Sequence, residues 1–158
     1  MLNTSKITLV AALVLPAMVT AAEDSGRWEF KEKGVIVDAF SGLQWTQRDN
    51  LGDITWPDAK AYCDTLPLAG GGWRLPTMQE LSQVYTAGRD GTTPCGESVC
   101  KVSPKFYLTN VWFWSNELTA SSDGSSGAWG ILLRNGNRDV TTLSDSGIPR
   151  ALCVRRRS

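Results

Sequence analysis

The sequence contains no histidine among its 158 residues. That absence excludes a Ser-His-Asp triad, a Cys-His nucleophile pair and a metal centre built on imidazole ligands. The sequence also lacks the Cys-x-x-Cys spacing of redox and zinc sites. It therefore predicts a protein that is not an enzyme and holds no metal and no cofactor.

Carboxylates are the remaining route to catalysis, because two of them about 5–9 Å apart in one cleft can hydrolyse glycosides. Asp49, Asp53, Asp58 and Asp64 lie near one another in the sequence. The role expected for them is in turns and helix caps. We therefore expect no such pair, and a carboxylate-dependent hydrolase is the least favoured function.

An excess of charge of one sign is also missing, since 16 basic residues balance 16 acidic ones. A nucleic-acid-binding domain normally carries a clear basic excess. Only the run at residues 155–157 is locally basic, and it is expected to be a solvated tail. Nucleic acid is therefore not an expected partner.

No apolar run is long enough to span a membrane. The longest, at residues 7–15, follows Lys6 and precedes small residues, which is the pattern of a signal peptide. We interpret residues 1–22 as this peptide, with cleavage near Ala21 or Ala22. Residues 23–158 then form a single exported domain, periplasmic or secreted, without a membrane span.

Cysteines are few, and the four present favour two disulfides in an oxidising compartment. Three pairings are possible. Cys95 and Cys100 enclose four residues, among them Gly96, so a small local ring is plausible. Cys63 and Cys153 would then be left to pair.

The rest of the chain is arranged around Gly-Gly-Gly-Trp-Arg-Leu-Pro-Thr at residues 70–77. Glycines allow backbone angles that other residues resist, so this segment predicts a tight loop that places Trp73 and Leu75 in the interior. Thr77 and Glu80 have the spacing of a capping box, which predicts a helix over residues 78–86.

Other local signals predict the elements on either side. Thr55 is expected to cap a helix whose inner face includes Cys63. Short strands are expected at residues 28–31, 35–38, 43–47, 111–115 and 150–155, and residues 89–105 are expected to form a loop.

Asn135-Gly136 has the composition of a two-residue hairpin turn. Such a turn would pair Ile131 with Val140 and Trp129 with Thr142, with Trp129 in the core. The opposite face would be wet and would carry Arg134, Asn137 and Asp139, as a solvated surface or a polar binding surface.

These motifs occur in an order that resembles the Lcl C-terminal-like family of bacterial domains. The resemblance rests on Gly34-x-x-x-Asp38, on Trp-x-x-Ala-x-x-Tyr-Cys at residues 56–63, on the run at residues 70–77 and on the closing Cys-Val-Arg at residues 153–155. It covers nearly all of residues 23–158.

The resemblance implies an α+β, C-type-lectin-like fold related to formylglycine-generating-enzyme domains. Two helices would pack on short twisted antiparallel sheets, stapled by disulfides. It also implies a disulfide from the first helix to the last strand, in agreement with a Cys63–Cys153 pair. One relative is the end of a collagen-like adhesin that binds sulfated glycosaminoglycans, but this sequence has no collagen-like repeat.

Our leading hypothesis is a non-catalytic module that binds a glycan or a cell-envelope protein, in adhesion or envelope interaction. Lectin-like folds place ligands at loops near the sheet ends, so the candidate ligand-binding residues are Asn116, Glu117, Arg134, Asn137 and Asp139. The alternative is a structural subunit of an envelope assembly. That alternative requires an exposed apolar patch around Trp112 and Trp114.

Overall fold

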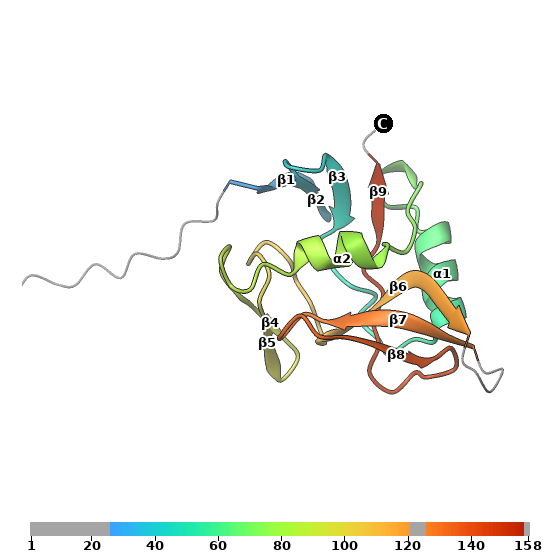
Figure 1. Cartoon of the computed structure of the whole chain (residues 1–158). Helices are drawn as coiled ribbons and strands as arrows, with labels where there is room; N and C mark the ends of the chain where they lie inside the picture. The colour runs from blue at the N-terminus through green and yellow to red at the C-terminus, as the bar shows by residue number, and fades with distance from the viewer. Residues whose placement is uncertain (1–25, 121–125, 157–158) are drawn as a thin grey trace, which may run out of the picture.

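The computed structural model describes residues 26–120 and 126–156, so the predicted signal peptide and Arg157 lie outside the described residues. The chain forms an α+β fold of two α-helices, a 3₁₀ turn and three antiparallel sheets (Figure 1). The elements are β1 (Trp28–Glu32), β2 (Val35–Asp38), β3 (Leu43–Thr46), α1 (Trp56–Thr65), η1 (Leu68–Gly70), α2 (Met78–Val84), β4 (Thr93–Cys95), β5 (Ser98–Cys100), β6 (Trp112–Ala120), β7 (Ser126–Leu132), β8 (Arg138–Thr142) and β9 (Val154–Arg156).

The first sheet has the strand order β1-β2-β3-β9, and its central strands β2 and β3 are covered on both faces. Ile36, Trp45 and Val154 are paired in register and belong to one buried cluster. Val35 and Cys153 belong to a second buried cluster. Two-sided burial explains why apolar residues in β2 are consecutive and do not alternate with polar ones.

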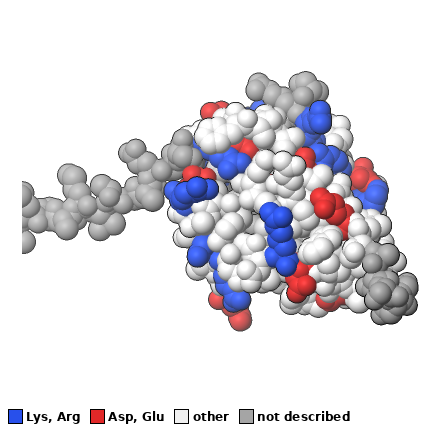
Figure 2. All heavy atoms as spheres, viewed as in Figure 1, with Lys and Arg blue, Asp and Glu red and all other residues white. Residues whose placement is uncertain are grey.

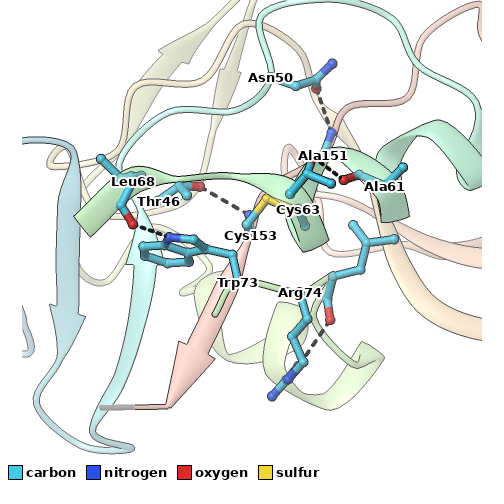
Figure 3. The surroundings of a disulfide bond; sticks show 11 residues. Thr46, Asn50, Ala61, Cys63, Leu68, Trp73, Arg74, Ala151 and Cys153 are labelled. Carbon is cyan, nitrogen blue, oxygen red and sulfur yellow. Dashed lines mark hydrogen bonds between the residues drawn. A yellow bond between two sulfur atoms is a disulfide. The ribbon is translucent and has the colours of Figure 1, made fainter. Parts of the chain in front are cut away.

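Helix α1 forms as its sequence predicts. Thr55 is the N-cap, and its hydroxyl accepts a hydrogen bond from the Asp58 amide. Ala59 and Cys63 are buried on the inner face, and Cys63 is disulfide-bonded to Cys153, just before β9 (Figure 3). The pairing that the family resemblance implied is therefore confirmed.

The central loop crosses from α1 to α2 with left-handed backbone angles at three glycines in succession, residues 70–72. It buries Trp73 and Leu75, as predicted. The Trp73 indole donates a 2.7 Å hydrogen bond to the Leu68 carbonyl (Figure 3). Arg155 of β9 lies over the Trp73 ring, 4.4 Å from its centroid, so the loop is held against the last strand.

Helix α2 lies between the first sheet and the sheet of β6, β7 and β8 (Figure 1). Its capping box is present in full between Thr77 and Glu80. The Glu80 carboxylate also receives two hydrogen bonds from Arg74, of 2.7 and 2.8 Å. The helix ends at Val84, two residues earlier than predicted, because Tyr85 has an extended backbone.

The hairpin of β7 and β8 differs from its prediction. Trp129 pairs with Val140 and Ile131 with Arg138, so the predicted register is wrong by two residues. The turn that joins the two strands is wider than two residues, since the Leu132 carbonyl accepts hydrogen bonds from the amides of both Asn135 and Gly136. Ile131 is buried as predicted, whereas Trp129 is 36% exposed and does not lie in the core.

Two further strand predictions need correction. Residues 89–105 do not form a loop throughout, since they contain the β4–β5 hairpin, which the Cys95–Cys100 disulfide closes. The closing strand β9 covers only Val154–Arg156. Before it, Arg150 exchanges backbone hydrogen bonds with β6, whereas the Cys153 carbonyl still accepts one from Thr46 of β3. Both disulfides expected from the sequence are present.

Acid is expected to destabilise this fold through two carboxylates, the buried Asp38 and the half-buried Glu80. Burial alone would raise the pKa of Asp38, but hydrogen bonds from Arg27, Ser41 and Phe40 outweigh it and lower that pKa. Burial alone would also raise the pKa of Glu80, but hydrogen bonds from Arg74 and Thr77 outweigh it and lower that pKa.

Because both pKa values are lower in the folded state, their contribution is complete above the unfolded carboxyl pKa of about 4. It is lost as pH falls from there through the folded values. Denaturant titrations between pH 7 and pH 2 should show this decline, and Asp38→Asn should reduce it. The exposed control Glu97→Gln should leave the curve unchanged. A flat profile below pH 4 would contradict the prediction.

Candidate functional site

The described structure contains a hollow of about 590 Å³ between α1 and the first sheet, which we call the α1 hollow. The turn between β1 and β2, the end of β3 and η1 complete its wall. Its lining residues are Lys33, Gly34, Thr46, Gln47, Arg48, Tyr62, Leu66 and Leu68. None of these side chains is acidic.

The floor of the α1 hollow is apolar. Tyr62 and Leu66 are one turn apart on α1, so they lie on the same flank of the helix. Gly34 has a left-handed φ of 84°, and a Cβ there would approach the Leu68 side chain to 3.3 Å. Glycine at this position therefore allows the turn and the close approach of Leu68.

Basic groups at the rim are positioned by backbone bonds. The Gln47 amide donates to the Gly34 carbonyl at 2.8 Å, and the Tyr107 amide donates to the Gln47 carbonyl at 2.8 Å. Arg48 lies over the exposed Tyr107 ring, 4.6 Å from its centroid. Within residues 26–120 and 126–156, neither Lys33 nor Arg48 forms an ion pair with a carboxylate.

Tyr62 contributes a neutral hydroxyl to the hollow. Burial, and secondarily the negative charge of Asp49, raise the pKa of Tyr62 above its usual value. The hydroxyl therefore keeps its proton at neutral pH and can both donate and accept a hydrogen bond. It has no hydrogen-bond partner among the described residues. An apolar floor, a free hydroxyl and two unneutralised cations suit an amphipathic ligand that carries negative charge.

The structure places four of the five predicted ligand-binding residues near the two ends of α2, two at each end. Asn116 and Glu117 are exposed at a bulge in β6, where the Glu117 carboxylate accepts a 2.8 Å bond from the Met78 amide at the start of α2. Arg134 and Asn137 lie in the β7–β8 loop, whose Gly136 approaches the Tyr85 ring at the other end.

Helix α2 has seven residues, so its ends are about 10 Å apart. The described hollow that Arg134 lines, beside the β4–β5 hairpin, contains none of the other four residues. Asp139 is exposed on β8, and its carboxylate accepts a bond from the adjacent Val140 amide. The five residues therefore do not converge on one hollow in the described part of the chain.

The sequence did not reveal the α1 hollow because its polar residues come from three segments. Lys33, Arg48 and Tyr62 are brought together only when α1 packs on the first sheet. One signal was available: Tyr62 precedes the disulfide cysteine, one position away from the buried face of α1. A large polar aromatic at such a boundary is a candidate for a site that is apolar on one side and wet on the other.

The order of motifs around this site has a counterpart among known proteins. A model of the Lcl C-terminal domain matches residues 34–155. The chain belongs to the Lcl C-terminal domain family. This Lcl C-terminal domain includes every residue of the α1 hollow except Lys33. A search of curated proteins found no match to the chain.

The face of the domain that Figure 2 shows carries side chains of both charges. On the face that carries α2, basic and acidic side chains are interspersed and not gathered by sign (Figure 2). No helix among the described residues is long and apolar enough to cross a membrane. In the same part of the chain, no group of three acidic or cysteine side chains is placed to hold a metal ion.

Proposed function

We propose that this Lcl C-terminal domain is an exported, non-catalytic binding module with a C-type-lectin-like fold, and that it recognises a glycan in the α1 hollow. The observation that carries the proposal is the combination of Tyr62, Lys33 and Arg48 around an apolar floor. Sugars offer an apolar face to such a floor, and their hydroxyl or acidic groups suit a phenol and two cations. Two disulfides agree with an oxidising compartment.

A binding role without catalysis is supported by the chemistry of the hollow. The α1 hollow has no carboxylate in its lining, and general acid–base cleavage of a glycoside needs two. The structural-subunit alternative gains no support, because Trp112 and Trp114 are 5% and 0% exposed and provide no apolar patch.

The proposal predicts a charge-dependent loss of glycan binding in Lys33→Ser/Arg48→Ser. Each lost charge-assisted contact is worth about 1.5–3 kcal/mol, so affinity for an acidic glycan should fall at least about tenfold. An array of neutral, carboxylated and sulfated glycans, probed with the oxidised domain, identifies the ligand. Titration calorimetry at two salt concentrations then measures the loss.

The matched control is Lys101→Ser/Arg138→Ser, which removes two exposed cations that do not line the α1 hollow. It should bind like the unmodified domain. Equal losses in both variants would mean that binding follows overall charge and would refute the assignment of the site. Abolition of binding by a calcium chelator would also refute it.

A further inference from the structure

A second recognition surface lies on the exposed side of α2. Two adjoining hollows, of about 500 and 420 Å³, share Ser41 and Gln83. Together they form one groove between α2 and the turn that joins β2 to β3, which we call the α2 groove. Arg156 of β9 lines one end of the groove and Phe40 of the turn lines the other.

The charged residues in the walls of the α2 groove neutralise one another. Asp38 is 1% exposed and accepts two hydrogen bonds from Arg27, of 2.7 and 2.8 Å. It also accepts bonds from the Phe40 amide and the Ser41 hydroxyl, so the turn has a fixed shape. Glu80 is held in the same way by Arg74 and by the helix cap.

The groups that remain for recognition are few and well separated. Gln79 and Gln83 are exposed, and neither side chain has a hydrogen-bond partner among the described residues. Arg156 is exposed and forms no ion pair within that part of the chain. Phe40 is 77% exposed, although the bonds to Asp38 fix its backbone. The α2 groove thus offers an aromatic ring, two carboxamides and a cation, in that order.

We infer that the α2 groove binds an extended polypeptide segment of a partner protein. Residues four apart on a helix are separated by about 6 Å along its axis. Backbone groups on one side of an extended strand recur every second residue, at about 6.6 Å. The Gln79 and Gln83 carboxamides, each with a donor and an acceptor, therefore match the repeat of peptide groups along an extended chain.

Charge complementarity sets the direction and composition of the segment. Among the described residues that line the groove, Arg156 is the only charged one without a partner in its wall, so it should receive a carboxylate. Phe40 should receive an apolar side chain. The expected ligand is a short extended segment with an apolar residue at one end and an acidic residue at the other. This inference does not depend on glycan binding in the α1 hollow.

The test uses synthetic blocked peptides with leucine at one end, aspartate at the other, and one, two or three serines between them. Each has a counterpart with lysine in place of aspartate. Titration into the isotope-labelled, oxidised domain should shift the side-chain amide signals of Gln79 and Gln83 for at least one aspartate peptide. Arg156→Glu should weaken the binding of that peptide at least about tenfold and strengthen the binding of its lysine counterpart.

Arg138→Glu is the matched control, because Arg138 is exposed on β8 and does not line the groove. It should leave peptide binding unchanged, and near-ultraviolet circular dichroism should show that both variants are folded. Three results would overturn the inference: no amide shift at millimolar peptide, equal effects of the two variants, or shifts confined to the α1 hollow. A shift of Gln79 and Gln83 by glycans and not by peptides would also overturn it.

Discussion

Replacement of Cys63 and Cys153 together by alanine is expected to lower the free energy of unfolding by about 4–5 kcal/mol. The disulfide joins residues separated by 90 positions, so its loss releases a large loop in the unfolded chain. Both cysteines are completely buried, and their replacement also removes packed sulfur atoms from the core. Guanidinium unfolding of the oxidised protein, followed by tryptophan fluorescence, measures the difference.

The second disulfide provides the matched comparison. Cys95 and Cys100 are separated by only five positions, so the same loop argument gives about 2 kcal/mol for the double alanine variant. The Cys63/Cys153 variant should therefore be the less stable of the two by at least about 2 kcal/mol. The reverse order would contradict the view that the tie between α1 and β9 is the main covalent constraint on the fold.

Arg155→Met is expected to have the next largest effect, a loss of about 3 kcal/mol. The guanidinium donates to Gln44 at 2.8 Å, and to the carbonyls of Ala69 and Gly71 at 2.8 and 2.7 Å. Methionine fills part of the same space but leaves these acceptors without a donor. Each buried acceptor left without a hydrogen bond costs about 1–3 kcal/mol of stability. Thermal and denaturant unfolding report the change.

Two controls separate the hydrogen bonds from charge. Arg155→Lys keeps the charge, but an ammonium cannot reproduce the planar fork that reaches three acceptors. It should recover less than half of the loss. Arg138→Met removes an exposed arginine and should change stability by no more than about 0.5 kcal/mol. Full rescue by lysine would show that charge, and not hydrogen-bond geometry, is what Arg155 contributes.

Helices and the central loop were predictable because their signals are local. Thr55 and Thr77 cap helices through bonds within three residues, and glycine allows the left-handed angles that residues 70–72 adopt. Four cysteines allow three pairings. The Cys63–Cys153 pair was the one left if Cys95 joins Cys100, and the family resemblance implied the same pair. Sequence patterns therefore predicted the elements, and cysteine spacing together with the resemblance predicted how two of them are joined.

The hairpin register was not predictable from the Asn-Gly pair alone, because Gly136 also meets a side chain that is distant in the sequence. Gly136 has the left-handed φ that an Asn-Gly turn requires, but a Cβ at this position would lie 2.6 Å from the Tyr85 ring. Glycine is therefore needed for contact with the end of α2 as well as for the turn. The wider loop shifts the pairing of β7 with β8 by two residues. A shift of two keeps each side chain on its face of the sheet, so it does not account for the exposure of Trp129.

Candidate binding residues were the least predictable part. Asn116 and Glu117 were chosen as polar residues at the end of a predicted strand, but the Glu117 carboxylate has a structural bond to the Met78 amide. The α1 hollow needs Lys33, Arg48 and Tyr62 at once, and no short window of sequence contains them. A site of this kind appears only when packing has been determined.

The nested arrangement of the two disulfides has a consequence for biogenesis. Ribosomes make Cys153 90 residues after Cys63, and both cysteines of the small ring are made in between. A thiol at position 63 therefore waits through a period in which its only available partners are wrong ones. If Cys95 pairs with Cys100 first, both competitors are removed and Cys63 is left with Cys153.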